Sequence, residues 1–361
     1  MRTSFILIIL LLPFRLLIAQ AISLNGSPLS PPTTPGAPTS CNDDYEFRNL
    51  AVGLPTVSGN CITMTNGALV NGSSAVWICT PLNLTIDFNI TFDANFGSNV
   101  ASGDGIAFVM DGDPDIEMGG DGVYMGYHSI NPSVAVEFDT WPDADINCDH
   151  AEIHYGGIVN NISNPTPLKP CCGTINDGLD HTICISWDAS TSTLRALFDG
   201  NVVGQYQGSI ATLLGTNSPV WGITTGCGSG GQVQRICNVS MSNNISTVAS
   251  CPSCTPPNIS VLTNSLSICN GESLNLSLSS SSSGTSYCWS AGDNTSVQGE
   301  TLNDQISSTI TDTLTLTSGF TQTVTYTVIA ASNGCISPPY SFDVTVSNGI
   351  NLLITLSLIH I

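Results

Sequence analysis

The chain has 361 residues, of which only 6 are Lys or Arg and 27 are Asp or Glu, so its formal net charge is −21. Four basic residues remain once Arg2 and Arg15 leave with the signal peptide expected below. This balance excludes nucleic acid and anionic membrane surfaces as partners, because both require clustered positive charge. Acidity on its own indicates solubility and defines no site.

The N-terminus predicts export. An apolar run over residues 5–12 is followed by the small residues of Ala19-Gln20-Ala21, which predicts a signal peptide over 1–21. Pro13 and Arg15 interrupt the apolar stretch, leaving it too short to cross about 30 Å of hydrocarbon. We therefore expect a secreted or cell-surface protein with no transmembrane span after signal cleavage.

Fourteen cysteines in an exported chain favour disulfides over zinc or thiol chemistry. The one CxxC motif, Cys251 to Cys254, lies in a Pro-rich connector without a helical pattern after it, so we expect a small structural loop rather than a redox motif. The adjacent Cys171 and Cys172 predict a disulfide to a neighbouring loop. Nine cysteines precede the motif and three follow it, which leaves the pairing open.

Periodicity along the chain predicts an all-β protein. Residues 22–40 have a Pro/Ser/Thr-rich linker composition, and residues 41–250 carry short β-branched runs, such as the alternating 82–92, that predict one large β-sandwich. After a Cys/Pro connector at 251–258, residues 259–348 alternate again and predict a small immunoglobulin-like sandwich. Residues 349–361 are interpreted as an artefactual tail beyond which the natural chain continues, with a genuine terminal strand as the alternative.

One strand and the acidic loop after it carry the chemistry of the first domain. Glu137 and Asp139 fall on the same face of the apolar strand over 134–139. Two carboxylates there are costly to bury unless a cation or a shared proton compensates. The alternative is a solvated acidic turn.

The loop offers enough oxygen ligands for calcium. Hard cations of this kind take six to eight oxygens, and Asp139, Asp143, Asp145 and the carbonyl of Trp141 can converge from one tight loop. Adding Glu137 and His150 gives a mixed oxygen and nitrogen shell. Such a shell suits manganese or another first-row divalent metal beside the calcium.

A set of motifs in fixed order resembles the legume-type, or L-type, lectins, especially their secreted bacterial relatives, over about residues 45–240. The segments that carry the resemblance are Gly103-Asp104-Gly105-Ile106-Ala107-Phe108-Val109, Met125-Gly126-Tyr127, Val134-Ala135-Val136-Glu137-Phe138-Asp139-Thr140, Asp149-His150, Asn176-Asp177-Gly178, Ser186-Trp187-Asp188, Phe198-Asp199-Gly200 and Val220-Trp221-Gly222.

The resemblance implies a concanavalin-like sandwich with two metals beside a shallow sugar cleft. By position, the implied transition-metal ligands are Glu137, Asp139, Asp145 and His150. The implied calcium ligands are Asp139, Trp141, Asp143 and Asp145. A second register, with Asp149 and His154, keeps the same aspartate-to-histidine spacing.

The resemblance also implies a carbohydrate site. Asp104 matches the aspartate that accepts hydrogen bonds from sugar hydroxyls, and its glycine neighbours let backbone approach a ligand closely. The other implied carbohydrate-binding positions are Gly122, Asp143, Gly226, Cys227 and Gly228. Three residues depart from the family pattern: Asp143 replaces an asparagine, Gly103 an alanine and Val123 a glycine. A Gly-Asp-Gly hairpin turn is the alternative interpretation of Asp104.

Three functions follow for the whole chain. The leading prediction is a calcium-dependent and manganese-dependent lectin for glycans, polysaccharides or glycoproteins, carrying a spacer module over 259–348 that resembles polycystic-kidney-disease-like (PKD-like) domains. A structural adhesin that keeps the metals without sugar binding is the second. A glycoside hydrolase is the third, but no carboxylate stands at Trp141 or Pro142 to act as its acid, so we expect no enzyme. Oligomerisation stays open.

Overall fold

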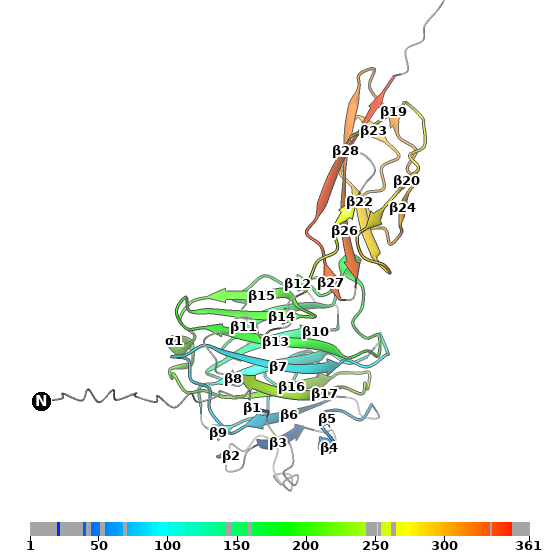
Figure 1. Cartoon of the computed structure of the whole chain (residues 1–361). Helices are drawn as coiled ribbons and strands as arrows, with labels where there is room; N and C mark the ends of the chain where they lie inside the picture. The colour runs from blue at the N-terminus through cyan, green and yellow to red at the C-terminus, as the bar shows by residue number, and fades with distance from the viewer. Residues whose placement is uncertain are drawn as a thin grey trace, which may run out of the picture.

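The computed structural model describes residues 20–21, 39–40, 45–50, 55–67, 71–100, 102–113, 115–141, 146–157, 161–242, 251, 254–260, 265–332 and 334–348. Several predictions therefore fall outside the described residues: nearly all of the signal peptide and linker, the tail 349–361, and the side chains of Asp143 and Asp145. The all-β prediction is confirmed, because the described elements are almost entirely strands (Figure 1).

One sheet of the first domain has eight antiparallel strands in the order β15-β14-β13-β7-β17-β5-β4, with β1 beside β17. Its strands are β1 (Gln20–Ala21), β4 (Thr56–Ser58), β5 (Cys61–Thr63), β7 (Phe88–Asn95), β13 (His181–Asp188), β14 (Thr193–Phe198), β15 (Asn201–Gln207) and β17 (Arg235–Ser242).

The facing sheet has seven antiparallel strands in the order β12-β11-β10-β8-β16-β6-β3. These are β3 (Tyr45–Leu50), β6 (Gly72–Ile78), β8 (Gly105–Asp111), β10 (Ser133–Asp139), β11 (His150–Tyr155), β12 (Thr166–Pro167) and β16 (Val220–Cys227).

Alternation along each strand builds the core between the two sheets. On β10, for example, Val134, Val136 and Phe138 point into that core, where they join Ile106 and Phe108 of β8. The intervening residues of the same strands point to the other face of the seven-stranded sheet. Polar side chains of these strands therefore occur at the alternate positions, which point away from the core between the two sheets.

That other face is also buried, because a loop over residues 117–132 folds across it. Met125, Tyr127 and Ile130 from the loop pack with Ala107 and Ala135 of the sheet in a second apolar cluster. Every residue of β8, β10 and β16 is buried as a result. Polar side chains on this face consequently lie between a sheet and its cover rather than in water.

Few short elements interrupt the strands. The described residues include one α-helix, α1 (Ile210–Leu214), capped by Ser209, two 3₁₀ turns at Gly122–Tyr124 and Pro170–Cys172, and a small pair formed by β2 (Thr39–Ser40) and β9 (Asp115–Ile116). Among those residues, no helix is long and apolar enough to cross a membrane.

The second domain is a small sandwich with its own apolar core around Trp289, Tyr326 and Phe342. Its main sheet has the order β19-β28-β26-β22, with β27 beside β26 and β19 parallel to β28. The strands are β18 (Ile259–Ser260), β19 (Ser265–Cys269), β20 (Leu276–Ser277), β21 (Ser279–Ser280), β22 (Ser286–Ala291), β23 (Val297–Gln298), β24 (Thr309–Ile310), β25 (Thr315–Leu316), β26 (Gln322–Ser332), β27 (Cys335–Ile336) and β28 (Tyr340–Ser347).

Two disulfides attach the connector between the domains, one to each domain. Cys251 is bonded to Cys184 in the first domain, and Cys254 is bonded to Cys335 in the second. The sequence left the pairing of the CxxC motif open, and the structure shows that its two cysteines are bonded to different domains. The motif is a joint between the domains.

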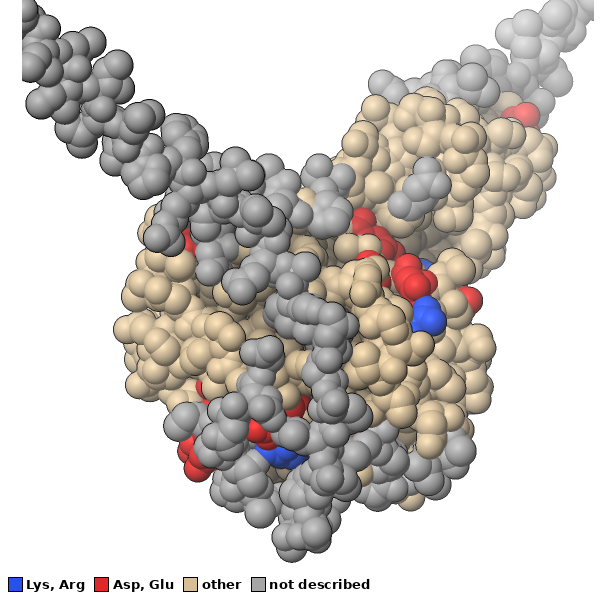
Figure 2. All heavy atoms as spheres, turned by 60° about the horizontal axis from the view of Figure 1, so that its bottom comes forward, with Lys and Arg blue, Asp and Glu red and all other residues tan. Residues whose placement is uncertain are grey.

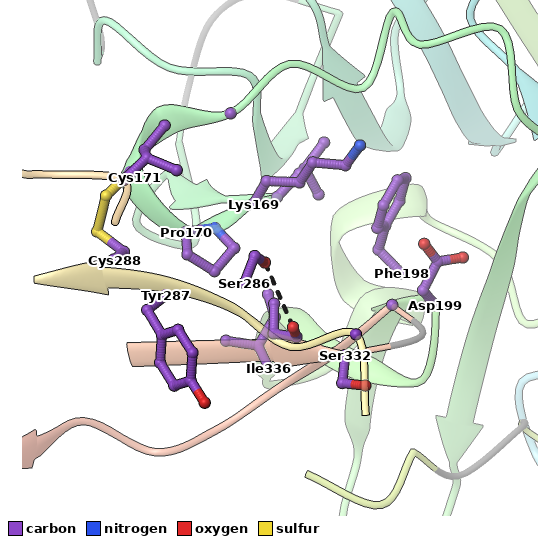
Figure 3. Close-up of a pocket in the computed structure, with 16 residues that line it drawn as sticks. Lys169, Pro170, Cys171, Phe198, Asp199, Ser286, Tyr287, Cys288, Ser332 and Ile336 are labelled. Carbon is purple, nitrogen blue, oxygen red and sulfur yellow. Dashed lines mark hydrogen bonds between the residues drawn. A yellow bond between two sulfur atoms is a disulfide. The ribbon is translucent and has the colours of Figure 1, made fainter. Parts of the chain in front are cut away.

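A third bond, between Cys171 and Cys288, crosses the junction directly (Figure 3). Around it lies a cavity of about 340 Å³ whose walls include Lys169 and Phe198 of the first domain and Tyr287 of the second. Asn201 adds two polar contacts across the junction, donating to the Gly334 carbonyl at 2.7 Å and accepting from the Ile336 amide at 2.9 Å. The two domains are thus joined by covalent and polar contacts.

We expect the double variant C171S/C288S to loosen the junction while leaving each domain folded, because each has its own core. The bond closes 117 residues of sequence, which corresponds to about 5 kcal/mol of unfolding free energy on chain-entropy grounds. Small-angle scattering should show a broader range of interdomain distances than in the wild type. The matched control is C269S, which removes an exposed free thiol; identical scattering from all three proteins would contradict the prediction.

Candidate metal and ligand-binding site

A cluster of buried carboxylates and imidazoles lies on the covered face of the seven-stranded sheet. Glu137 and Asp139 come from β10 and His150 from β11, and their ligand atoms all lie within 4.8 Å of one another. None of the three residues is more than 4% exposed. Antiparallel pairing of Asp139 with His150 produces this arrangement.

The cluster continues one step along the same strands. Glu152 pairs with Glu137 across β10 and β11, and His154 follows two residues later on the same face of β11. The His154 Nε2 atom lies 2.7 Å from Glu137 Oε1, and the Tyr127 hydroxyl donates to Glu137 Oε2 at 2.6 Å. Burial, and then the negative charge of Glu137, raise the pKa of Tyr127 well above its usual value.

The basic residues of the described chain serve other parts of the fold. They form the contacts Arg48 with Glu46 at 2.6 Å, Lys169 with Asp177 at 2.6 Å, Arg195 with Gln205 at 3.0 Å and Arg235 with Asp180 at 2.7 Å. Figure 2 likewise shows the basic atoms in view lying against acidic atoms. Positive charge in the described part of the cluster must therefore come from its two imidazoles or from a bound cation.

These residues fit a metal. Carboxylates taken out of water are strongly destabilised without a compensating charge, and a set of oxygens with one imidazole nitrogen is the kind that first-row divalent ions accept. The cluster is held in register by two strands of a fully buried sheet, so its ligand atoms are positioned in advance. The described cluster can accordingly hold a divalent cation.

A cleft of about 280 Å³ opens beside this cluster. Its lining residues are Ser102, Gly103, Asp104, Asp121, Gly122, Val123, Trp141, Gly228, Ser229 and Gly230. The Asp104 side chain is buried at its edge and accepts a hydrogen bond from the Gly228 amide. No lysine or arginine is among these described lining residues, so two carboxylates dominate the charge of the cleft.

Hydrogen bonds connect the cleft to the cluster. The Asp139 carboxylate accepts from the Trp141 amide at 2.6 Å, and Trp141 lines the cleft. Between these two residues, Thr140 donates its amide to the Asp104 carbonyl at 3.2 Å and its hydroxyl to the Gly103 carbonyl at 3.2 Å. A shift in the position of Asp139 would therefore move Thr140 and Trp141, which contact or line the cleft.

Glycine is required where the cleft meets the sheet. Gly105 has φ +131° and pairs with Asp139, and a Cβ on it would collide with the Phe138 carbonyl. A Cβ on Gly226 would likewise collide with the Gly122 carbonyl. These close approaches bring the end of β16 and the 117–132 loop against Asp104.

The structure distributes the remaining sequence-predicted residues as follows. Gly122 and Gly228 line the cleft, whereas Gly226 and Cys227 lie inside β16 and do not line it. The Cys227 side chain is buried, and burial raises the pKa of its thiol. Asp149 accepts hydrogen bonds from the Thr174 hydroxyl and the Ile175 amide. Of the second register, the described metal-type clusters include His154 and not Asp149.

Sequence reasoning missed two acidic members of the site. Asp121 lines the cleft together with the expected residues, and its signal was its place in the glycine-rich segment 119–122. Glu152 joins the cluster, and its signal was the two-residue spacing from His150 and His154 along one strand.

Two facing sheets with an acidic cleft at the strand ends make the first domain a β-sandwich with a candidate ligand site. The family model described as the legume lectin beta-barrel domain matches residues 39–240, and the chain therefore belongs to this family. A second family model, the PKD-like domain, matches residues 266–349.

Several solved structures are similar to this chain at low sequence identity. The Bauhinia forficata lectin in complex with GalNAc has 19% identity and a TM-score of 0.48, covering 57% of this chain and 94% of that one. Griffonia simplicifolia lectin I-B4 in its metal-free form has 18% identity and a TM-score of 0.45, covering 56% and 94%. The Ca²⁺-bound exoplasmic/lumenal domain of VIP36 has 13% identity and a TM-score of 0.43, covering 56% and 84%.

We expect Gly105→Ala to destabilise the first domain by about 3 kcal/mol, because it adds a backbone collision to an unfavourable positive φ. Thermal unfolding followed by circular dichroism measures this change. Gly59→Ala is the matched control, since Gly59 has φ +60° but no atom within 4 Å of an added Cβ. Its expected cost is about 1 kcal/mol, and equal losses in the two variants would contradict the collision argument.

Proposed function

We propose that the protein is a secreted or cell-surface lectin that binds neutral glycans in the cleft at Asp104 and depends on calcium and a first-row metal, with manganese as the leading choice. The observation that carries this proposal is the hydrogen-bonded connection from Asp139 through Thr140 to Asp104. It couples a buried cation-type cluster to an open acidic cleft. Family membership supports the same function.

Sugar recognition in this cleft rests on three kinds of group. The Asp104 carboxylate accepts hydrogen bonds from hydroxyls, and such charge-assisted bonds are shorter and stronger than neutral ones. Backbone amides of the 122–123 turn offer donors, and Trp141 offers an aromatic face for the apolar side of a sugar ring.

Metal ligation is proposed by position. The residues for the first-row metal are Glu137, Asp139, Asp145 and His150, and those for calcium are Asp139, Asp143, Asp145 and the Trp141 carbonyl. Bound cations supply the charge that stabilises the carboxylates. Asp139, which belongs to both sets, then keeps Trp141 and Thr140 in place for the cleft.

A structural adhesin that keeps the metals without sugar binding is the second candidate. Asp143 favours it, because an ionised carboxylate cannot donate the hydrogen bond that an asparagine amide gives to a sugar. Val123 also replaces a glycine at the cleft, and its side chain is 42% exposed. Catalysis is not proposed, since the position where a hydrolase acid would stand is Trp141.

The proposed location and partners follow from the same features. Export is expected from the N-terminal sequence, and the five described disulfides suit an oxidising compartment. Glycans, polysaccharides or glycoproteins are the proposed partners, and nucleic acid is not. The PKD-like domain is proposed to hold the cleft away from the surface to which the chain is attached.

We expect Asp104→Asn to weaken glycan binding by about 10-fold to 100-fold, the range expected when a charge-assisted hydrogen bond is lost. Glycan-array binding of the mature chain, with calcium and manganese present and again after chelation, measures the effect. Asp343→Asn removes the same charge from the second domain and should leave binding unchanged. Metal-dependent stability without any glycan signal would select the adhesin instead.

The acidic lining also predicts which glycans are rejected. Asp104 and Asp121 should repel sialylated, uronic or sulfated glycans, so that neutral glycans bind at least about 5-fold more tightly at low salt. Asp121→Asn should narrow this difference without abolishing binding of the neutral glycan. The measurement is paired titration with a neutral glycan and its sulfated form at two ionic strengths; a difference independent of both salt and Asp121 would refute the electrostatic explanation.

A further inference from the structure

The strand β11 carries more ligand-type side chains than the proposed pair of metals uses. His150, Glu152 and His154 alternate along it and face the same side of the sheet. Only His150 belongs to the proposed first-row site. Glu152 is fully buried, and the side chain of His154 is 1% exposed.

We propose that Glu137, Glu152 and His154 form a second transition-metal site, with Glu137 shared between it and the site at His150. This proposal is independent of sugar binding, because it concerns the covered face of the sheet and not the cleft. It assigns a function to two buried residues that the proposed lectin mechanism leaves unused.

The distances fit a common ion. The His154 Nε2 atom lies 2.7 Å from Glu137 Oε1 and 3.7 Å from Glu152 Oε2, and the ligand atoms of all three residues lie within 4.8 Å of one another. Ligands at about 2.0–2.2 Å from one ion are separated by about 3–3.6 Å in tetrahedral or octahedral geometry. The observed separations bracket this range, so small rotations of the side chains complete the site.

The surroundings of Glu137 are those of a supported ligand. Tyr127 donates to Oε2 of Glu137, which leaves Oε1 directed at the two histidines, 2.7 Å from His154 and 4.0 Å from His150. Hydrogen bonds of this kind orient ligating carboxylates. Oε1 is thus placed between two imidazoles, as a bridging oxygen would be.

The neighbouring residues make the site dry and select the metal. Opposite His154 on β10 stands Ala135, which packs with Met125 and Ile130 of the covering loop. A buried set of one imidazole and two carboxylates suits zinc, manganese or iron(II), whereas calcium takes more oxygens and usually keeps water or carbonyl ligands. We therefore assign the site to a first-row divalent ion.

Metal counting tests the proposal. The chelated mature chain is loaded with excess calcium and Mn²⁺, desalted and analysed by inductively coupled plasma mass spectrometry. The wild type should hold about two equivalents of manganese, and E152Q and H154Q about one each. The matched control, D111N, replaces a carboxylate of β8 that is equally buried but outside the cluster, and it should keep the wild-type count.

A second measurement needs no variant. Two Mn²⁺ ions that share the Glu137 carboxylate lie about 4 Å apart, so the wild-type electron paramagnetic resonance spectrum should show exchange coupling. Equal manganese counts in the wild type and both variants, whether one or two equivalents, would overturn the proposal and leave Glu152 and His154 as an ion pair. If neither variant folds, the spectrum decides: an uncoupled signal overturns the proposal. Loss of glycan binding alone changes neither readout, so failure of the proposed function is recognised separately.

Discussion

The burial of Glu137, Asp139 and Glu152 on adjacent strands is the constraint on which the rest of the first domain depends. Each is at most 4% exposed, and the described lysines and arginines make their contacts elsewhere. A carboxylate in such a place is destabilising unless protons or cations compensate, so the sheet is stable only with that compensation. The register of β10 and β11 places His150 and His154 beside these acids, so that protons or cations can be held there. We therefore expect folding to be linked to the uptake of protons or cations at this cluster.

The same constraint explains why the seven-stranded sheet is covered. A sandwich needs only one apolar face per sheet, yet the loop over 117–132 buries the outer face as well. The cover removes water from the acidic cluster, which strengthens its attraction for a cation. It also carries Asp121 and Gly122 to the edge of the cleft. One loop therefore serves both the buried cluster and the open cleft.

The two-residue alternation of apolar and polar side chains predicted this fold well, because it shows which side chains point to each face of a strand. Residues 134–139 read as a buried strand with two acids on one face, and β10 has that form. The alternation over 82–92 was only half a strand: Leu82 and Leu84 are buried, but their amides bond to the carbonyls of Pro219 and Asn217, and β7 begins at Phe88. Alternation in the sequence indicates which side chains are buried. It does not distinguish a strand that is hydrogen-bonded in a sheet from a loop whose alternate side chains are equally well packed.

Contacts distant in sequence were beyond that reasoning. Asp121 reaches the cleft only because the covering loop returns to it, and no local pattern encodes that return. Disulfide pairing was hidden for the same reason, since Cys251 and Cys254 are only three positions apart in the chain but bond to different domains. Glu152 was visible in the spacing of β11, but its importance depends on Glu137 lying opposite.

The adjacent residues Cys171 and Cys172 connect the second domain to the edge of the acidic cluster. Cys172 is bonded to Cys148, whose carbonyl lies 3.0 Å from Nδ1 of His150, and Cys171 is bonded to Cys288 of the second domain. Carbonyls in that position fix the tautomer and orientation of a ligating imidazole. Cys148, which orients His150, is thus joined to the PKD-like domain through two disulfides, and the peptide bond between Cys171 and Cys172 links these two disulfides. An unbroken covalent path therefore runs from Cys288 of the second domain to Cys148 at the edge of the acidic cluster, so the two domains are linked at the point where His150 is oriented.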